Sequence, residues 1–136
     1  MSRNVDGEAL LAAARAVRQH AHAPYSKFAV GAAVLDEQGR IHAGCNVETV
    51  AYPQGWCAEA SAIAVMIAAG GKRVLGVAVC AESHRPVPPC GGCRQKLLEF
   101  ANDDCPIFIG DLQGVRVSHR LVDLMPFSFG PQYLAP

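Results

Sequence analysis

Two short motifs, which together hold three cysteines and a glutamate, limit the possible folds of this chain more than any other feature. The first is Cys57-Ala58-Glu59, and the second, after 29 intervening residues, is Pro89-Cys90-Gly91-Gly92-Cys93. A C-x-x-C pair places two thiolates on one side of a turn, and zinc prefers such soft ligands in tetrahedral geometry. We therefore predict that Cys57 joins Cys90 and Cys93 around one Zn²⁺ ion. Three protein ligands leave one coordination position open, which is typical of catalytic rather than structural zinc sites.

Each motif stands where a helix is expected to begin. Residues 58–69 are rich in Ala, Ile, Val and Met and are closed by Gly70-Gly71, and residues 91–100 carry apolar side chains at helical spacing. The N-terminus of a helix carries partial positive charge and free N–H groups, which favour a thiolate over a thiol. The chain must therefore fold so that two helix starts face each other.

Glu59 follows the first ligand by two residues, so we expect its carboxylate to lie near the metal without binding it. Zinc lowers the pKa of a water molecule towards neutrality. Hydrolytic deamination also requires protons to reach a ring nitrogen and the leaving amine, and one carboxylate can carry both. This combination is typical of zinc-dependent nucleobase deaminases. The two motifs thus predict a zinc aminohydrolase with Glu59 as its proton carrier.

Other interpretations of the same residues remain open at this point. A C-x-x-C pair can be a redox couple, although a distant C-x-E partner is not expected there. A purely structural zinc site needs a fourth ligand, which Cys45 or His84 can supply. Glu59 can also be an ordinary first-turn carboxylate that interacts with the helix dipole.

The rest of the chain predicts an α/β fold in one domain, residues 1–136. An amphipathic helix is expected from Asp6, its N-cap, to about His22, and Pro24 ends it. Further elements are a hairpin of residues 28–35 and 40–46, a buried strand at 74–81, short strands at 107–109 and 115–117, and a helical turn at 121–125. Strands that alternate with helices after a hairpin favour a three-layer α/β/α sandwich with a mixed central sheet.

Composition excludes several classes of function. Acidic and basic side chains number 12 each, so no net charge attracts nucleic acid or an anionic membrane. No apolar run approaches the roughly 20 residues that cross a bilayer, and the first residues do not resemble a signal peptide. Six cysteines in a chain without these signals favour metal or core roles in a reducing compartment. We therefore expect a cytoplasmic protein.

The chain resembles the small, homo-oligomeric cytidine deaminases over nearly its whole length. The segments that carry the resemblance are Pro24–Ala33, Cys45–Glu48, Tyr52-Pro53, Cys57–Glu59, Pro89–Gln95 and Met125–Pro131. The resemblance implies zinc-dependent deamination of cytidine and 2′-deoxycytidine with release of ammonia, a role in pyrimidine salvage, and a homotetramer with shared active sites. It implies a nucleoside or pyrimidine-like small molecule as substrate, and the charge balance predicts neither nucleic acid nor a membrane as partner.

The resemblance also implies roles for individual residues. Asn46 and Glu48 match residues that hydrogen-bond the ribose hydroxyls, which an amide and a carboxylate suit chemically. Phe28 matches a ring beside the bound nucleoside, and the backbone of Ala58 matches the group that addresses the pyrimidine. Tyr52 and Phe129 match residues contributed across a subunit boundary.

Four residues depart from the family pattern: Thr49, Trp56, Ala60 and Lys96. Where Ala60 stands, the family usually has an arginine that offsets the charge of a zinc–thiolate site, so we expect Arg94 and the helix N–H groups to take over that role. These departures leave a second hypothesis open, the same chemistry on blasticidin S, isocytosine or an N4-substituted cytidine. A third is a non-catalytic interaction module stabilised by zinc.

Overall fold

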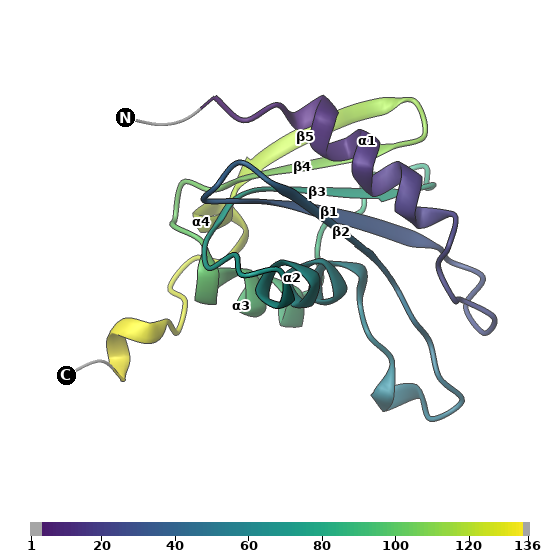
Figure 1. Cartoon of the computed structure of the whole chain (residues 1–136). Coiled ribbons are helices and arrows are strands. Elements are labelled where there is room, and N and C mark those ends of the chain that lie inside the picture. The colour runs from purple at the N-terminus through teal and green to yellow at the C-terminus, as the bar shows by residue number, and fades with distance from the viewer. Residues whose placement is uncertain (1–3, 135–136) are drawn as a thin grey trace.

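A five-stranded mixed sheet forms the centre of the computed structural model, which describes residues 4–134 (Figure 1). The strands are β1 (Val30–Asp36), β2 (Ile41–Cys45), β3 (Val74–Ala81), β4 (Pro106–Asp111) and β5 (Gly114–Arg120), in the spatial order β2-β1-β3-β4-β5. Strand β1 runs antiparallel to both β2 and β3, and β5 runs antiparallel to β4. Only β3 and β4 are parallel, as expected for strands joined by a helical crossover.

Helices cover both faces of this sheet. Helix α1 (Gly7–Arg18) lies on one face, and α2 (Ala58–Ala68), α3 (Gly91–Phe100) and the short α4 (Leu121–Leu124) lie on the other (Figure 1). Two single-turn 3₁₀ helices, η1 (Tyr52–Gln54) and η2 (Pro131–Tyr133), lie outside these layers. The prediction of a three-layer α/β/α sandwich with a mixed sheet is confirmed.

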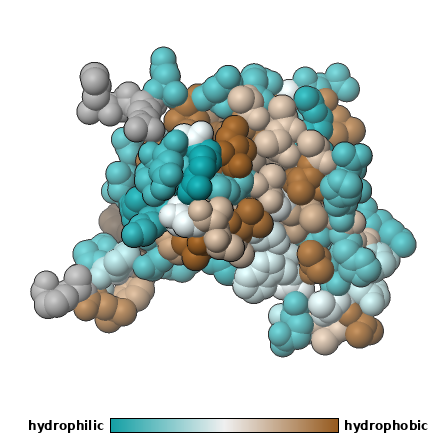
Figure 2. Space-filling view, viewed as in Figure 1, coloured by the Kyte–Doolittle hydropathy of each residue, from teal (hydrophilic) through white to brown (hydrophobic). Residues whose placement is uncertain are grey.

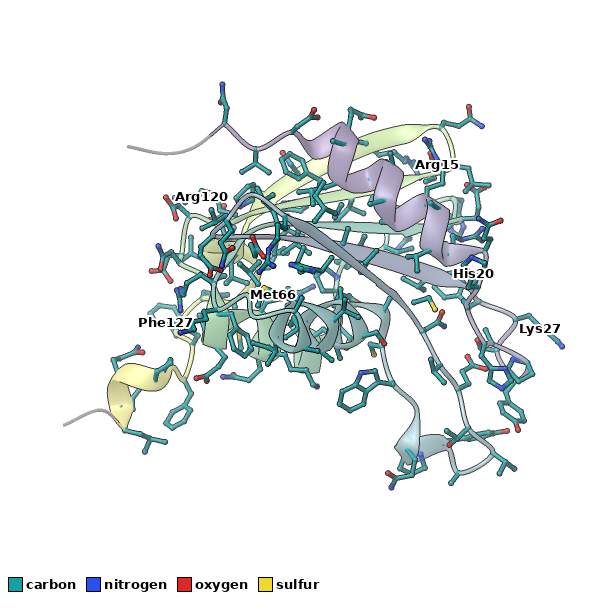
Figure 3. The ribbon with its side chains drawn as sticks, viewed as in Figure 1. Arg15, His20, Lys27, Met66, Arg120 and Phe127 are labelled. Carbon is teal, nitrogen blue, oxygen red and sulfur yellow. The ribbon has the colours of Figure 1, made fainter. Side chains whose placement is uncertain are left out.

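The two faces pack closely because small residues line both contacts. A Cβ atom on Gly31 of β1 would stand 1.9 Å from the Ala14 carbonyl oxygen of α1, and one on Gly44 of β2 would stand 2.4 Å from the Ala62 nitrogen of α2. The absence of a side chain at these positions therefore lets each helix lie directly on the sheet. Met66 points from α2 into the core beneath the sheet and is fully buried (Figure 3).

Some element boundaries agree with those predicted from the sequence, and others do not. Strand β3 and helix α3 have the predicted bounds, and α1 begins after Asp6, whose carboxylate accepts a hydrogen bond from the Ala9 N–H. Helix α1 ends at Arg18 rather than near His22, because His22 leaves the helix to pair with the segment after β2. Its N–H donates to the Asn46 carbonyl and its carbonyl accepts from the Glu48 N–H. Strands β4 and β5 extend beyond their apolar cores because hairpin pairing continues to Arg120.

The sheet topology explains why two helices begin side by side. Gly31 of β1 is paired with Cys45 on one side and with Cys80 on the other, so the carboxyl ends of β2 and β3 lie at the same edge. Helix α2 follows β2 after residues 46–57, and α3 follows β3 after residues 82–90. Both helices therefore start at this edge, while Asp36 at the end of β1 lies at the opposite edge, paired with Val74.

Two segments project from the layered body: the loop of residues 46–57, which includes η1, and the C-terminal segment of residues 125–134 (Figure 1). Hydrophobic residues lie exposed on both (Figure 2). They are Val47, Val50, Tyr52, Trp56, Phe127, Phe129, Tyr133 and Leu134. Within residues 4–134, no helix combines the length and the apolar character that a membrane span requires.

Candidate metal centre

The three predicted ligands come together at the two facing helix starts. Cys57 is the N-cap residue of α2, Cys90 is the N-cap residue of α3, and Cys93 lies in the first turn of α3. Their sulfur atoms all lie within 4.8 Å of one another, and the Cys57 and Cys90 sulfurs are 3.9 Å apart. A tetrahedral ion with bonds of about 2.3 Å places its sulfur ligands about 3.8 Å apart. The spacing and the donor type therefore fit zinc.

Neither N-cap cysteine caps its helix with a hydrogen bond to its sulfur. Both Cys57 and Cys90 have extended backbone conformations, and neither side chain caps the N–H groups of its helix. The partial positive charge of the two helix starts is thus directed towards the sulfur cluster. Such an environment favours thiolates.

Burial opposes the ionisation of all three thiols, and neighbouring charges add to this effect at Cys57 and Cys93. Burial raises the pKa of Cys93, and the charges of Glu59, Cys57 and Cys90 raise it further. Burial also raises the pKa of Cys57, and the charge of Cys90 adds to it. Burial acts in the same direction on Cys90, but the nearby Cys93 N–H and the neighbouring thiols outweigh it and lower the pKa of Cys90. Three thiolates so close together require a cation to be stable.

Glu59 lies in the first turn of α2, two residues after Cys57, and is only 5% exposed. Burial raises its pKa above the ordinary value, while its own N–H and the Lys96 ammonium act in the opposite direction. The pKa of a carboxyl group in such surroundings is closer to neutral pH, so the group can both take up and release a proton.

The predicted fourth-ligand candidates do not join the cluster. Among residues 4–134, the only group of His, Cys, Asp and Glu side chains spaced to hold a metal is the three-cysteine group itself. Cys45, His84 and Glu59 are not members of it. The interpretation as a closed structural zinc site therefore finds no support in the described part of the chain, and an open coordination position fits better.

The residues predicted to contact a substrate lie in separate regions of the structure. Ala58 is buried at the start of α2, beside the cysteines. The Asn46 amide bridges backbone groups: it accepts from the Val30 N–H at 2.9 Å and donates to the Phe28 carbonyl at 2.9 Å. Asn46 thereby fixes the segment that carries Phe28, whose side chain is 39% exposed.

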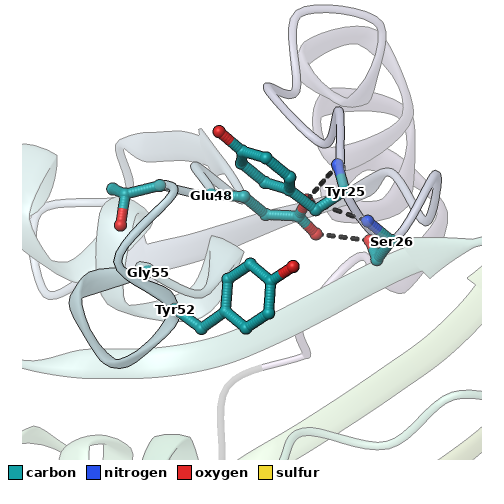
Figure 4. Close-up of a pocket in the computed structure, with 6 residues that line it drawn as sticks. Tyr25, Ser26, Glu48, Tyr52 and Gly55 are labelled. Carbon is teal, nitrogen blue, oxygen red and sulfur yellow. Dashed lines mark hydrogen bonds between the residues drawn. The ribbon is translucent and has the colours of Figure 1, made fainter.

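Glu48 and Tyr52 line a separate hollow of about 330 Å³ (Figure 4). Its other lining residues are Tyr25, Ser26, Thr49 and Gly55. The Glu48 carboxylate accepts hydrogen bonds from the Tyr25 N–H, the Ser26 N–H and the Ser26 hydroxyl, and these donors outweigh burial and lower its pKa. The Tyr25 and Tyr52 rings lie 5.6 Å apart. No predicted metal ligand lines this hollow.

Phe129 and Arg94 connect the C-terminal segment to α3. The Phe129 ring is exposed and stacks on Tyr133, while its carbonyl accepts a hydrogen bond from the Gln95 amide. The Arg94 guanidinium donates to the Pro89 carbonyl at 2.8 Å and to the Leu124 carbonyl at 2.7 Å. Arg94 thus links the turn before Cys90 to the end of α4, a role for which the sequence held no signal. Its predicted role in offsetting thiolate charge remains a prediction.

Comparison with known proteins gives a consistent result. The family model for the cytidine and deoxycytidylate deaminase zinc-binding region matches residues 5–109. A cytidine deaminase of Sporosarcina psychrophila is 39% identical over 131 residues, which cover 96% of each chain. One of Mycobacterium tuberculosis is 42% identical over 128 residues, covering 93% of this chain and 92% of that protein. The crystal structure of cytidine deaminase from Burkholderia pseudomallei has a TM-score of 0.85 at 38% identity, with 92% of this chain and 100% of that chain covered.

Proposed function

The chain belongs to the cytidine deaminase family, and from this premise we propose that it deaminates cytidine and 2′-deoxycytidine by hydrolysis. It is a hydrolase with zinc as its cofactor. The observation that carries the proposal is the cluster of three cysteine sulfurs at two facing helix starts, with the buried Glu59 two residues from one of them. A non-catalytic zinc module has no need of a buried carboxyl group at this place.

The proposed mechanism assigns a task to each of these side chains. Cys57, Cys90 and Cys93 would hold the zinc ion, which as a Lewis acid makes a water molecule acidic near neutral pH. Glu59 takes a proton from the attacking water and delivers protons to the ring nitrogen and to the departing amine. Cytidine and water thus become uridine and ammonia. The buried position of Glu59 keeps competing water away from its carboxyl group.

We propose that the nucleoside is held by residues near the same sheet edge. Asn46 and Glu48 would bind the ribose hydroxyls, and Phe28 would pack beside the nucleoside. The backbone of Ala58 would address the pyrimidine. In the single chain the Asn46 amide and the Glu48 carboxylate already accept hydrogen bonds from the backbone, which holds both side chains in fixed positions. Remaining lone pairs and donors are available for a ligand.

We further propose a cytoplasmic homotetramer whose subunits share their active sites. Tyr52 and Phe129, the two residues expected to reach a neighbouring subunit, lie on the two projecting segments and are 72% and 58% exposed. Large exposed apolar side chains on projecting segments are typical of surfaces that another chain covers. Six free cysteines are compatible with a reducing compartment.

The substrate is tested by measuring ammonia release from zinc-loaded protein. We expect cytidine and 2′-deoxycytidine to be converted faster than isocytosine, blasticidin S or N4-substituted cytidines. If both nucleosides stay unchanged while another member of this panel releases ammonia, the substrate assignment is wrong and the zinc chemistry is retained. If no compound in the panel reacts, the proposal of an aminohydrolase fails.

The metal site is tested by a matched pair of cysteine variants. Cys93→Ala should lose the bound zinc and all turnover, whereas Cys80→Ala, which removes an equally buried thiol from β3, should keep both. Zinc content by atomic absorption distinguishes them. Full zinc occupancy in Cys93→Ala would remove this residue from the ligand set.

A further inference from the structure

The proposed centre raises a question of charge. One Zn²⁺ ion with three thiolates has a net negative charge, which would weaken its pull on the oxygen of the attacking water molecule unless a cation stands nearby. Arg94, the expected cation, directs its guanidinium to the carbonyl oxygens of Pro89 and Leu124. Ala60, the residue next to Glu59, has no charge. A second cation near the two helix starts would therefore add to the offset of this charge.

Lys96 lies one turn after Gly92 on α3 and directs its side chain back towards the helix start. Its ammonium nitrogen stands 3.8 Å from the position that a Cβ on Gly92 would occupy, and 6.0 Å from the centroid of the Trp56 ring. Gly92 precedes the ligand Cys93, and Trp56 precedes the ligand Cys57. The ammonium is thus placed between the neighbours of two metal ligands that belong to different helices.

Trp56 is itself fixed in place by the backbone. Its N–H donates to the Val47 carbonyl at 2.8 Å and its carbonyl accepts from the Val47 N–H at 2.9 Å. The indole and Lys96 line one hollow of about 400 Å³ between α2 and α3, together with Ala60 and Gln95. The small side chain of Ala60 forms part of the wall of this space.

We propose that Lys96 supplies the counter-charge of the zinc–thiolate centre and that the Trp56 ring holds its ammonium there through a cation–π contact. This inference rests on the proposed zinc site. The two residues that depart from the family pattern beside the ligands, Trp56 and Lys96, then act as one unit. Lys96 is a positioning residue: it acts on the ligands and on Glu59 and touches no reacting atom.

A further observation supports this role. The four ion pairs found among residues 4–134 do not include Lys96. Glu99 lines the same hollow one turn further along α3, but no ion pair between the two is formed. The charge of Lys96 therefore remains available to the thiolates.

The test is a comparison of zinc affinities, measured by competition with a chromogenic chelator. Lys96→Met keeps the aliphatic stem and removes the charge, so its zinc dissociation constant should rise about twofold to fivefold, as for an exposed charge pair. Lys96→Arg should bind zinc nearly as tightly as the wild type. Lys72→Met is the matched control, because it removes the same charge beyond the far end of α2 and should change nothing.

Ionic strength separates a charge effect from a packing effect. At 1 M salt the Debye length is about 3 Å, so the difference between the wild type and Lys96→Met should largely disappear. A loss of affinity that persists at high salt, or that Lys96→Arg shares, overturns the inference in favour of simple packing on Trp56. Equal affinities of Lys96→Met and the wild type overturn it as well. A wild-type protein that binds no zinc would instead refute the proposed metal site.

Discussion

Two buried carboxyl groups at opposite edges of the sheet show how one fold uses the same chemical group in two ways. Asp36 ends β1 and is fully buried, and Glu59 begins α2 and is 5% exposed. Burial by itself raises the pKa of both. Their pKa values nevertheless move in opposite directions, and the cause is the number of hydrogen-bond donors around each.

Asp36 is surrounded by donors from its own hairpin. Its carboxylate accepts hydrogen bonds from the N–H groups of Gln38 and Arg40, from the Arg40 guanidinium and from the His42 ring, at 2.8–3.0 Å. Burial raises the pKa of Asp36, but these bonds, led by that of His42, hold it well below its usual range. A carboxylate held as an anion by four donors stabilises the hairpin and has no proton to exchange.

Glu59 has no such set of donors, so burial dominates and raises its pKa. A carboxyl group that is buried without compensating hydrogen bonds costs stability, and such groups are characteristic of functional sites. Burial alone therefore does not fix the direction in which the pKa of a carboxyl group moves in this fold. The number of hydrogen-bond donors around the group decides it.

The largest expected effect comes from Glu59→Gln. Turnover of cytidine should fall by about 10²–10⁴-fold, because the amide cannot carry a proton between water and the substrate. Zinc content should remain at the wild-type level, and the thermal midpoint should stay or rise slightly, since a costly buried acid is replaced by a neutral group. A turnover assay, metal analysis and a thermal melt measure these three quantities. If Glu59→Gln kept the wild-type turnover, Glu59 would not be the proton carrier.

Asp36→Asn should have the opposite effect to Glu59→Gln: it should lower stability and leave turnover unchanged. The amide oxygen accepts fewer and weaker hydrogen bonds than a carboxylate, so the free energy of unfolding should fall by about 2–3 kcal/mol. The thermal midpoint should drop by roughly 10 °C for a chain of this size. Turnover per zinc-loaded, folded molecule should be unchanged. A large loss of turnover at permissive temperature would show that the two edges are coupled.

The pH dependence of stability tests the role of Asp36 further. The pKa of Asp36 is below its unfolded value of 3.8, so its contribution to stability is fully present above about pH 4. It is lost as the pH falls towards the folded-state pKa. The stability difference between the wild type and Asp36→Asn should therefore shrink between pH 6 and pH 3 in urea titrations. Protonation of the metal-binding thiolates affects both proteins alike, so only their difference is compared; a difference that grows in acid would contradict the assignment.

Sequence patterns were sufficient wherever local chemistry sets the structure. Strand β3 was predicted to its exact bounds because a β-branched run is closed by polar residues, and α3 because Cys90 and the glycines mark its start. The cysteine cluster was predicted because spacing and ligand chemistry leave few arrangements. The end of α1 was missed because His22 pairs with a segment that is remote in sequence.

What depends on register or on packing between helices was not predictable in this way. Asp36, Arg40 and His42 look like polar residues around a turn until the pairing of Leu35 with Ile41 turns His42 inward. The approach of Lys96 to Trp56 depends on how α3 lies against α2. Glu48 and Tyr52 line a hollow without the metal ligands, so whether they reach a substrate depends on other subunits, which one chain's sequence does not place.

The smallest expected effect tests whether the donors around Asp36 are redundant. Arg40→Met removes the guanidinium, which contacts Asp36 at 2.9 Å and the Ala69 carbonyl at 3.2 Å, but the Arg40 N–H continues to donate to the carboxylate. Because the Arg40 side chain is 40% exposed, the loss should be about 1 kcal/mol or less in urea unfolding, well below that of Asp36→Asn.

Arg120→Met is the matched control for this variant, since it breaks the exposed ion pair of Arg120 with Asp123 and should leave the free energy of unfolding nearly unchanged. If Arg40→Met were as destabilising as Asp36→Asn, the guanidinium alone would hold the carboxylate as an anion. The contrast between Asp36 and Glu59 would then depend on one cation beside Asp36 rather than on the number of donors.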